Sequence, residues 1–152
     1  MTPEIRFIGL SKSARYALKA LAYLAHRQGD GFLMTDSVSI KTGVPANYLA
    51  KLFQKLTHAG AIESRRGRRG GVRLAVDPRW MTLAKIVLCV DSTPSEARPC
   101  LLDIKACSSE TPCLLHHRVV EAERSMTESL STVTLADFAK SVYSKDIKET
   151  TA

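Results

Sequence analysis

A helix-turn-helix pattern followed at once by a basic hairpin restricts the fold of this 152-residue chain more than any other feature. Residues 35–42 predict a short helix, capped by Thr35 or Asp36, and the glycine and proline of residues 43–45 force a turn. Residues 46–58 predict a second, amphipathic helix. Its expected buried stripe consists of Leu49, Leu52, Phe53 and Leu56. Two short helices joined by such a turn are typical of a helix-turn-helix.

The segment after the second helix predicts a β-hairpin with an arginine-rich tip. Residues 61–64 and 72–75 are the expected strands, and between them lies Arg65-Arg66-Gly67-Arg68-Arg69-Gly70-Gly71. A hairpin in this position is the wing of a winged helix. Residues 11–27, whose apolar positions recur at spacings of three and four, predict the helix that precedes the helix-turn-helix.

The second half of the chain predicts three more helices and a loop that bears cysteines. Residues 82–90 predict a helix, and residues 92–112, rich in proline and serine, predict a loop. A long helix is expected to begin at Pro112 or Cys113, and a last short helix covers residues 134–143. The long helix has a seam-like apolar stripe of Leu115, Val119, Ala122, Met126 and Leu130.

The charge of the chain is concentrated in its first half. The net charge is +7, but residues 1–80 hold fourteen Lys or Arg against five Asp or Glu, whereas residues 81–152 hold eight against ten. This asymmetry indicates a first half that binds a polyanion. Basic residues on a winged helix favour double-stranded DNA over the alternative of a merely solvated basic loop. The candidate DNA-binding residues are Asn47, Tyr48, Lys51, Lys55, Arg65, Arg66, Arg68 and Arg69, of which Tyr48 is equally compatible with packing.

These elements predict a mainly α fold with a small β-hairpin, in which a winged helix-turn-helix domain is joined to a long C-terminal dimerisation helix. Residues 1–80 are the expected DNA-binding domain, residues 81–145 the cysteine loop and dimerisation helices, and residues 146–152 a flexible tail. A homodimer of winged helices predicts a near-palindromic operator.

Several classes of protein are not indicated. The chain has no apolar stretch of the roughly 18 residues that span a bilayer, which predicts no membrane association. Its start lacks the pattern of a secretory signal, so we expect a cytoplasmic protein. No nucleophile–base pair, phosphate loop or carboxylate dyad is recognisable, which argues against an enzyme.

Four cysteines fall within residues 89–113, and three of them lie in the predicted loop and at its end. Cys100, Cys107 and Cys113 offer three thiolates, and His116 follows Cys113 by three residues, a spacing that places both on one face at a helix start. This spacing fits a tetrahedral zinc ion and an iron–sulfur cluster equally well. Free thiols are the remaining alternative, but they would oxidise readily in an exposed loop.

The other candidates near this loop are weaker. His117 could substitute for His116, although a lone histidine at a helix start is more often a surface residue. Cys89 lies in an apolar run and is expected to be a buried core residue.

The chain resembles the winged-helix iron–sulfur regulators, a family that includes IscR, NsrR and RirA, from about residue 10 to residue 141. The similar segments are the first helix from Leu10 to Leu18, the recognition helix Tyr48-Leu49-x-x-Leu52-Phe53-x-x-Leu56 and the wing Arg65-x-Gly67-x-x-Gly70-Gly71-Val72-x-Leu74. The three-cysteine loop sits where this family keeps its cluster.

The resemblance implies a homodimeric transcription regulator, either a repressor or an activator, that senses iron, nitric oxide or redox state. It favours an iron–sulfur cluster on Cys100, Cys107, Cys113 and His116 over zinc. Cys113-Leu114-Leu115-His116 is similar to the Cys-x₂-His of the IscR type, which implies a [2Fe–2S] cluster rather than [4Fe–4S]. The alternative is a zinc-stabilised or cluster-free DNA-binding regulator, controlled by a regulatory protein partner or by thiol oxidation.

Overall fold

The computed structural model describes residues 9–91 and 100–144. In chain order the elements are α1 (Lys12–His26), α2 (Thr35–Thr42), α3 (Ala46–His58), β1 (Ile62–Arg65), β2 (Gly71–Leu74), the 3₁₀ helix η1 (Pro78–Trp80), α4 (Leu83–Val90), α5 (His116–Thr132) and α6 (Leu135–Tyr143). The predicted mainly α fold with a small hairpin is confirmed. The expected tail, residues 146–152, and residues 92–99 of the expected loop lie outside the described residues.

Hydroxyl side chains fix where three of the helices begin. The side chain of Ser11 accepts a hydrogen bond from the Ala14 N–H at the start of α1. Thr82 caps α4 and Thr134 caps α6 in the same way. Such caps satisfy N–H groups that have no partner within the helix. At the other end of a helix, Gly43 ends α2 with φ of 72°, in the left-handed region that glycine adopts without strain.

Helix α1 is the centre of the core. Its eight buried residues lie on most sides of the helix, which is typical of a helix surrounded by other elements. It packs against α2, α3, α4, α6 and β2, and several of its buried positions are alanines, which let neighbouring backbones approach closely. Leu83 and Ile86 of α4 and Leu135 of α6 join the same core as Leu49 and Leu56 of α3.

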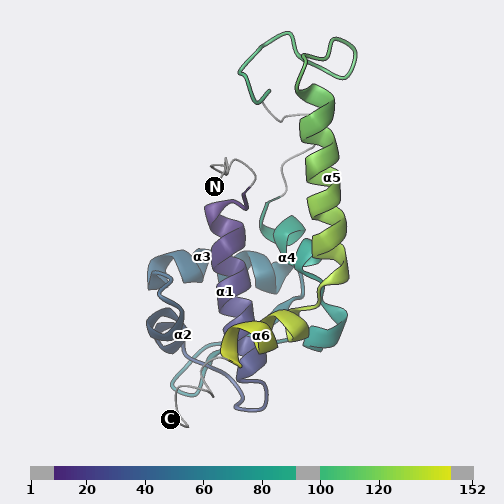
Figure 1. The fold of residues 1–152 in the computed structure, drawn as a ribbon. Helices are drawn as coiled ribbons and strands as arrows, with labels where there is room; N and C mark the ends of the chain where they lie inside the picture. The colour runs from purple at the N-terminus through teal and green to yellow at the C-terminus, as the bar shows by residue number, and fades with distance from the viewer. Residues whose placement is uncertain (1–8, 92–99, 145–152) are drawn as a thin grey trace, which may run out of the picture.

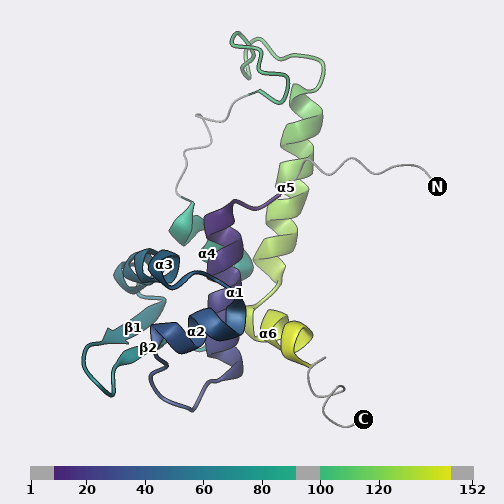
Figure 2. The ribbon, with the colours of Figure 1, turned by 90° about the vertical axis from the view of Figure 1, so that its left-hand side faces the viewer.

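The wing is anchored to the segment that enters α2. β1 and β2 are antiparallel, with Ile62 opposite Leu74 and Arg65 opposite Gly71. Leu33 forms a bridge to Val72 through two backbone hydrogen bonds of 2.9 and 2.8 Å. A Cβ atom on Gly71 would lie 2.2 Å from the Leu33 carbonyl oxygen, and its φ is 133°, so only glycine fits there. The segment around Leu33 therefore lies along one side of the hairpin, held by this single bridge, and the hairpin projects from the core beside α3 (Figure 2).

Helix α5 projects from the core and carries the cysteine loop at its N-terminal end (Figure 1). None of its residues is buried in the single chain. Leu130, near its C-terminal end, packs against the core, whereas Met126 is 45% exposed. No helix in the described part of the chain has the length and apolar character needed to cross a membrane.

Candidate functional site

The described part of the loop brings the three predicted cysteines together. The Sγ atoms of Cys100, Cys107 and Cys113 all lie within 4.8 Å of one another. The distance from Cys100 Sγ to Cys113 Sγ is 3.7 Å. Tight turns shape the loop, because the Asp103 N–H donates to the Cys100 carbonyl at 2.9 Å. Three half-buried thiols in this arrangement could hold a metal ion or cluster.

His116 lies beside the thiols, but not for the reason that the sequence suggested. Helix α5 begins at His116, so Cys113 lies before the helix and the predicted helical face is wrong. A turn keeps the two residues adjacent instead, since the His116 N–H donates to the Cys113 carbonyl at 3.1 Å. His116 Nδ1 lies 3.4 Å from Cys107 Sγ. The His117 ring contacts the His116 ring edge-on at 5.4 Å between centroids.

Hydrogen bonds and burial shift the pKa values of Cys100 and Cys107 in opposite directions. The Ile104 and Leu102 N–H groups hydrogen-bond to the sulfur of Cys100 and lower its pKa below the ordinary value. At Cys107 the Cys113 N–H also favours the thiolate, but desolvation and the neighbouring thiols Cys113 and Cys100 outweigh it and raise the pKa of Cys107. Because the thiolate is the form that binds metal, the lowered pKa of Cys100 favours its ligating form.

The thiols open onto a cavity of about 680 Å³ between the loop and one side of α5. Its lining includes all three cysteines, His116, Val119 and Glu123. The donor set facing this space, three sulfurs and one imidazole nitrogen, is soft and suits iron or zinc rather than magnesium or calcium. The residues present therefore fit a bound cluster or metal.

Helix α3 presents three of its predicted DNA-binding residues to solvent. Asn47, Lys51 and Lys55 are exposed. Tyr48 is half-buried instead, with its hydroxyl 2.7 Å from the hydroxyl of Ser13 and its ring edge-on to Tyr16, 5.0 Å between centroids. Tyr48 therefore links the start of α3 to the start of α1.

The wing presents Arg66, Arg68 and Arg69 at its exposed tip. Arg65, at the end of β1, lies over the ring of Phe32 instead, with 4.9 Å from its guanidinium carbon to the ring centroid. Three of the four arginines thus lie at the tip, and the fourth, Arg65, lies beside the tip over the Phe32 ring.

A groove of about 650 Å³ separates α3 from the wing and the start of α2. Gln54 and His58 line it from α3, opposite Arg65 and Arg66. Gln54 is absent from the candidates predicted from the sequence, although it lies three residues after Lys51 and seven after Asn47, on the same exposed side of the helix. The helical period that gives the buried stripe also places Gln54 on the exposed side of α3, where it could have been found.

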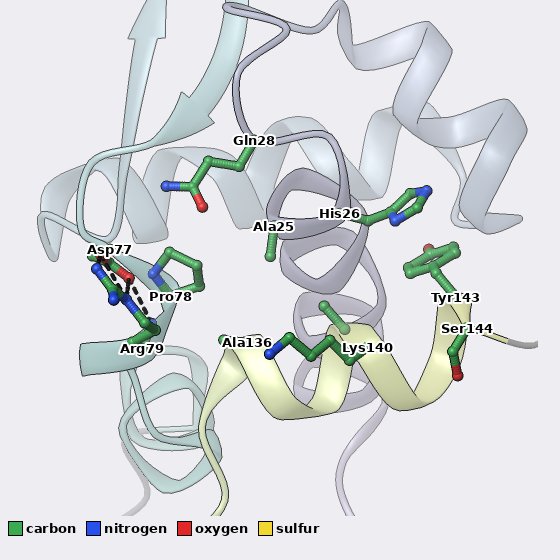
Figure 3. Close-up of a pocket in the computed structure, with 11 residues that line it drawn as sticks. Ala25, His26, Gln28, Asp77, Pro78, Arg79, Ala136, Lys140, Tyr143 and Ser144 are labelled. Carbon is green, nitrogen blue, oxygen red and sulfur yellow. Dashed lines mark hydrogen bonds and ion pairs between the residues drawn. The ribbon is translucent and has the colours of Figure 1, made fainter.

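A further cavity of about 590 Å³ lies between the end of α1, η1 and α6 (Figure 3). Three of its polar side chains, Asp77, Arg79 and His26, are engaged with neighbours. Arg79 binds Asp77 and lowers the pKa of that carboxyl group to about 2, and the ring of His26 stacks on Tyr143. This cavity includes none of the residues predicted to bind DNA or metal.

Comparison with known proteins agrees with this architecture. The chain matches the model of the Rrf2 family, described as iron-dependent transcriptional regulators, over residues 10–141. The HTH-type transcriptional regulator IscR of Vibrio cholerae is 32% identical over 130 residues, which cover 84% of this chain and 73% of the relative. IscR of Vibrio campbellii is 30% identical over 132 residues, covering 86% and 77%.

Solved structures give the same fold. T. potens IscR has a TM-score of 0.70 at 27% identity, covering 89% of this chain and 88% of that chain. CymR (YrzC), the global cysteine regulator of B. subtilis, has a TM-score of 0.71 at 23% identity, covering 88% and 98%, and this likeness concerns the fold alone.

The family match begins just before α1 and ends within α6, so it includes the winged helix, the cysteine loop and α5. The resemblance inferred from the sequence is therefore confirmed. Its members are regulators of transcription rather than enzymes, in agreement with a basic helix-turn-helix and wing. The chain belongs to the Rrf2 family of DNA-binding transcriptional regulators.

Proposed function

We propose that this regulator is a repressor whose DNA affinity is set by an iron–sulfur cluster held by Cys100, Cys107, Cys113 and His116. The observation that carries the proposal is the convergence of the three sulfur atoms within 4.8 Å, with the His116 imidazole beside them. The relatives named IscR and the Cys-x₂-His spacing support [2Fe–2S] over [4Fe–4S]. When bound, such a cluster supplies sensitivity to iron supply, nitric oxide or redox state.

The chain's own residues determine how that sensitivity reaches DNA. The three thiolates and the imidazole tie the loop to the first turn of α5. We infer that a second copy of the chain packs along α5, on the stripe of Leu115, Val119, Ala122, Met126 and Leu130. In such a dimer the loop fixes the angle between two winged helices and hence the spacing of two recognition helices on a near-palindromic operator.

A zinc-stabilised regulator is the second candidate, because three thiolates and one imidazole also make a tetrahedral zinc site. The family's description as iron-dependent favours iron. An anaerobic visible spectrum with an iron and zinc count separates the two, since a cluster protein is brown and a zinc protein is colourless.

His116→Ala is expected to leave the protein folded and dimeric but to make its cluster labile, with altered visible bands. Removing the imidazole leaves three thiolates and an open ligand position. His117→Ala is the matched control, because it deletes the neighbouring ring on the same turn, and it should keep a normal spectrum. Anaerobic absorption spectra followed over hours measure both. A stable cluster in His116→Ala together with a lost cluster in His117→Ala would show that the ligand is assigned wrongly.

Replacing both Arg68 and Arg69 by alanine is expected to weaken binding to duplex DNA and to flatten its salt dependence. Each lost phosphate contact lowers the slope of log K against log salt by about 0.9. Fluorescence anisotropy across a salt titration measures the slope, and Arg79→Ala, which removes an arginine already paired with Asp77, is the control. An unchanged slope in the double variant would exclude the wing tip from DNA contact.

A further inference from the structure

One aromatic side chain lies between two arginines of the wing. The bridge between Leu33 and Val72 is antiparallel, so Phe32 falls beside Arg73 on the exposed face of the hairpin. The guanidinium carbon of Arg73 lies 4.6 Å from the centre of the Phe32 ring, and that of Arg65 lies 4.9 Å from it. Both distances are within the roughly 6 Å at which a guanidinium is attracted to an aromatic face.

Gly71 makes this arrangement possible. It pairs with Arg65 in the register of the hairpin, and it has no side chain to occupy the space between β1 and Phe32. The Arg65 side chain therefore reaches across β2 and meets the ring. The Gly71 backbone lies against the Leu33 carbonyl, which keeps Phe32 close enough to β1 for that contact.

The two arginines differ in how their charge is balanced. Arg73 forms an ion pair of 2.8 Å with Glu63, its partner in the register. Arg65 forms no ion pair in the part of the chain that the structure describes. Arg65 also lines the groove between α3 and the wing, together with Arg66. The ring thus fixes the one of the two cations that has no ion pair among the described residues.

We propose that Phe32 is a positioning residue for DNA binding, which holds the Arg65 guanidinium beside the tip of the wing so that it meets the DNA backbone already ordered. An arginine side chain that no neighbour restrains loses rotamer freedom when it contacts DNA, and this loss weakens binding. A side chain already stacked on a ring loses less. The proposal rests on DNA binding by this winged helix, and it concerns a residue that lies outside both α3 and the hairpin strands.

The test is a double-mutant cycle on the full-length protein. The probe is a fluorescein-labelled duplex that the wild-type protein selects from a random-sequence pool. Phe32→Leu, Arg65→Ala and the double variant are titrated with this duplex at several salt concentrations. Phe32→Leu is expected to bind about three-fold to ten-fold more weakly than wild type, and Phe32→Tyr, which keeps the ring, to bind as wild type does. The double variant is expected to match Arg65→Ala, because Phe32 acts through Arg65.

The same samples separate positioning from folding and from the proposed function. Thermal unfolding and the chemical shift of the Arg65 Hε proton are recorded without DNA, and the ring-current shift of that proton should be lost in Phe32→Leu and kept in Phe32→Tyr. Additive losses in the cycle, or a Phe32→Leu variant that binds like wild type, would overturn the role of Phe32. Selection of no duplex by the wild-type protein would overturn DNA binding and, with it, this role.

Discussion

Cys113→Ser is expected to yield a folded protein that binds almost no iron and shows almost no visible absorption. Cys113 Sγ lies 3.7 Å from Cys100 Sγ, and the Cys113 N–H lies 3.4 Å from Cys107 Sγ, so this residue is central to the thiol group. A serine hydroxyl is a hard and weakly acidic donor, which is a poor substitute for a thiolate on iron or zinc. Anaerobic purification with iron and sulfide counts measures the loss.

Cys89→Ser is the matched control for this experiment, because Cys89 lies on α4 and packs against the core, away from the loop. It should retain iron and colour at the wild-type level. The loop in Cys113→Ser keeps its backbone turns, so circular dichroism and the unfolding temperature should change little. Wild-type iron content in Cys113→Ser would remove Cys113 from the ligand set, and loss of iron in Cys89→Ser alone would place the site elsewhere.

Met126→Glu is expected to convert the dimer into monomers or insoluble protein. Met126 lies midway along the proposed interface and is 45% exposed in the single chain, so a second copy would cover it. Burying an unpaired carboxylate costs about 3 kcal/mol and a symmetric dimer would bury two, which raises the dimer dissociation constant by well over ~100-fold. Sedimentation or light scattering at several concentrations measures the change.

The control places the same charge one residue away. Ser125 is exposed and points about 100° around the helix from Met126, so Ser125→Glu should remain a dimer. Met126→Leu, which keeps the apolar volume, should also remain a dimer. A clean dimer in Met126→Glu would show that the chains associate through another surface.

The elements that the sequence predicted correctly are those set by local patterns. The buried stripe of α3 and the cap of α4 at Thr82 follow from spacing and residue type alone, and both are present. The glycines of the wing also located the hairpin, because their backbone demands are local. By contrast, η1 was not predicted. It depends on the Asp77 side chain, which accepts a hydrogen bond from the Arg79 N–H, and such a short helix has no apolar period.

The features that escaped prediction depend on contacts between distant segments. The period of α3 leaves Tyr48 open to either DNA contact or packing, and the contact with Ser13, 35 residues earlier, accounts for its half-buried position. The contact between Phe32 and Arg65 requires the bridge from Leu33 to Val72, which joins segments on either side of the helix-turn-helix. The start of α5 at His116 was misplaced because a turn, rather than a helix, brings Cys113 and His116 together.

The way α5 is attached has a mechanical consequence. Its C-terminal end is seated in the core through Leu130 and α4, whereas the cysteines lie beyond its other end. A helix of 17 residues is about 25 Å long, so a rotation of about 5° at the seated end displaces the far end by about 2 Å. α4 also packs against α1 and α3, so it connects the seated end of α5 to the winged helix. A displacement of the thiol end of α5 would therefore reach α3 through α4, as a small rotation at the seated end.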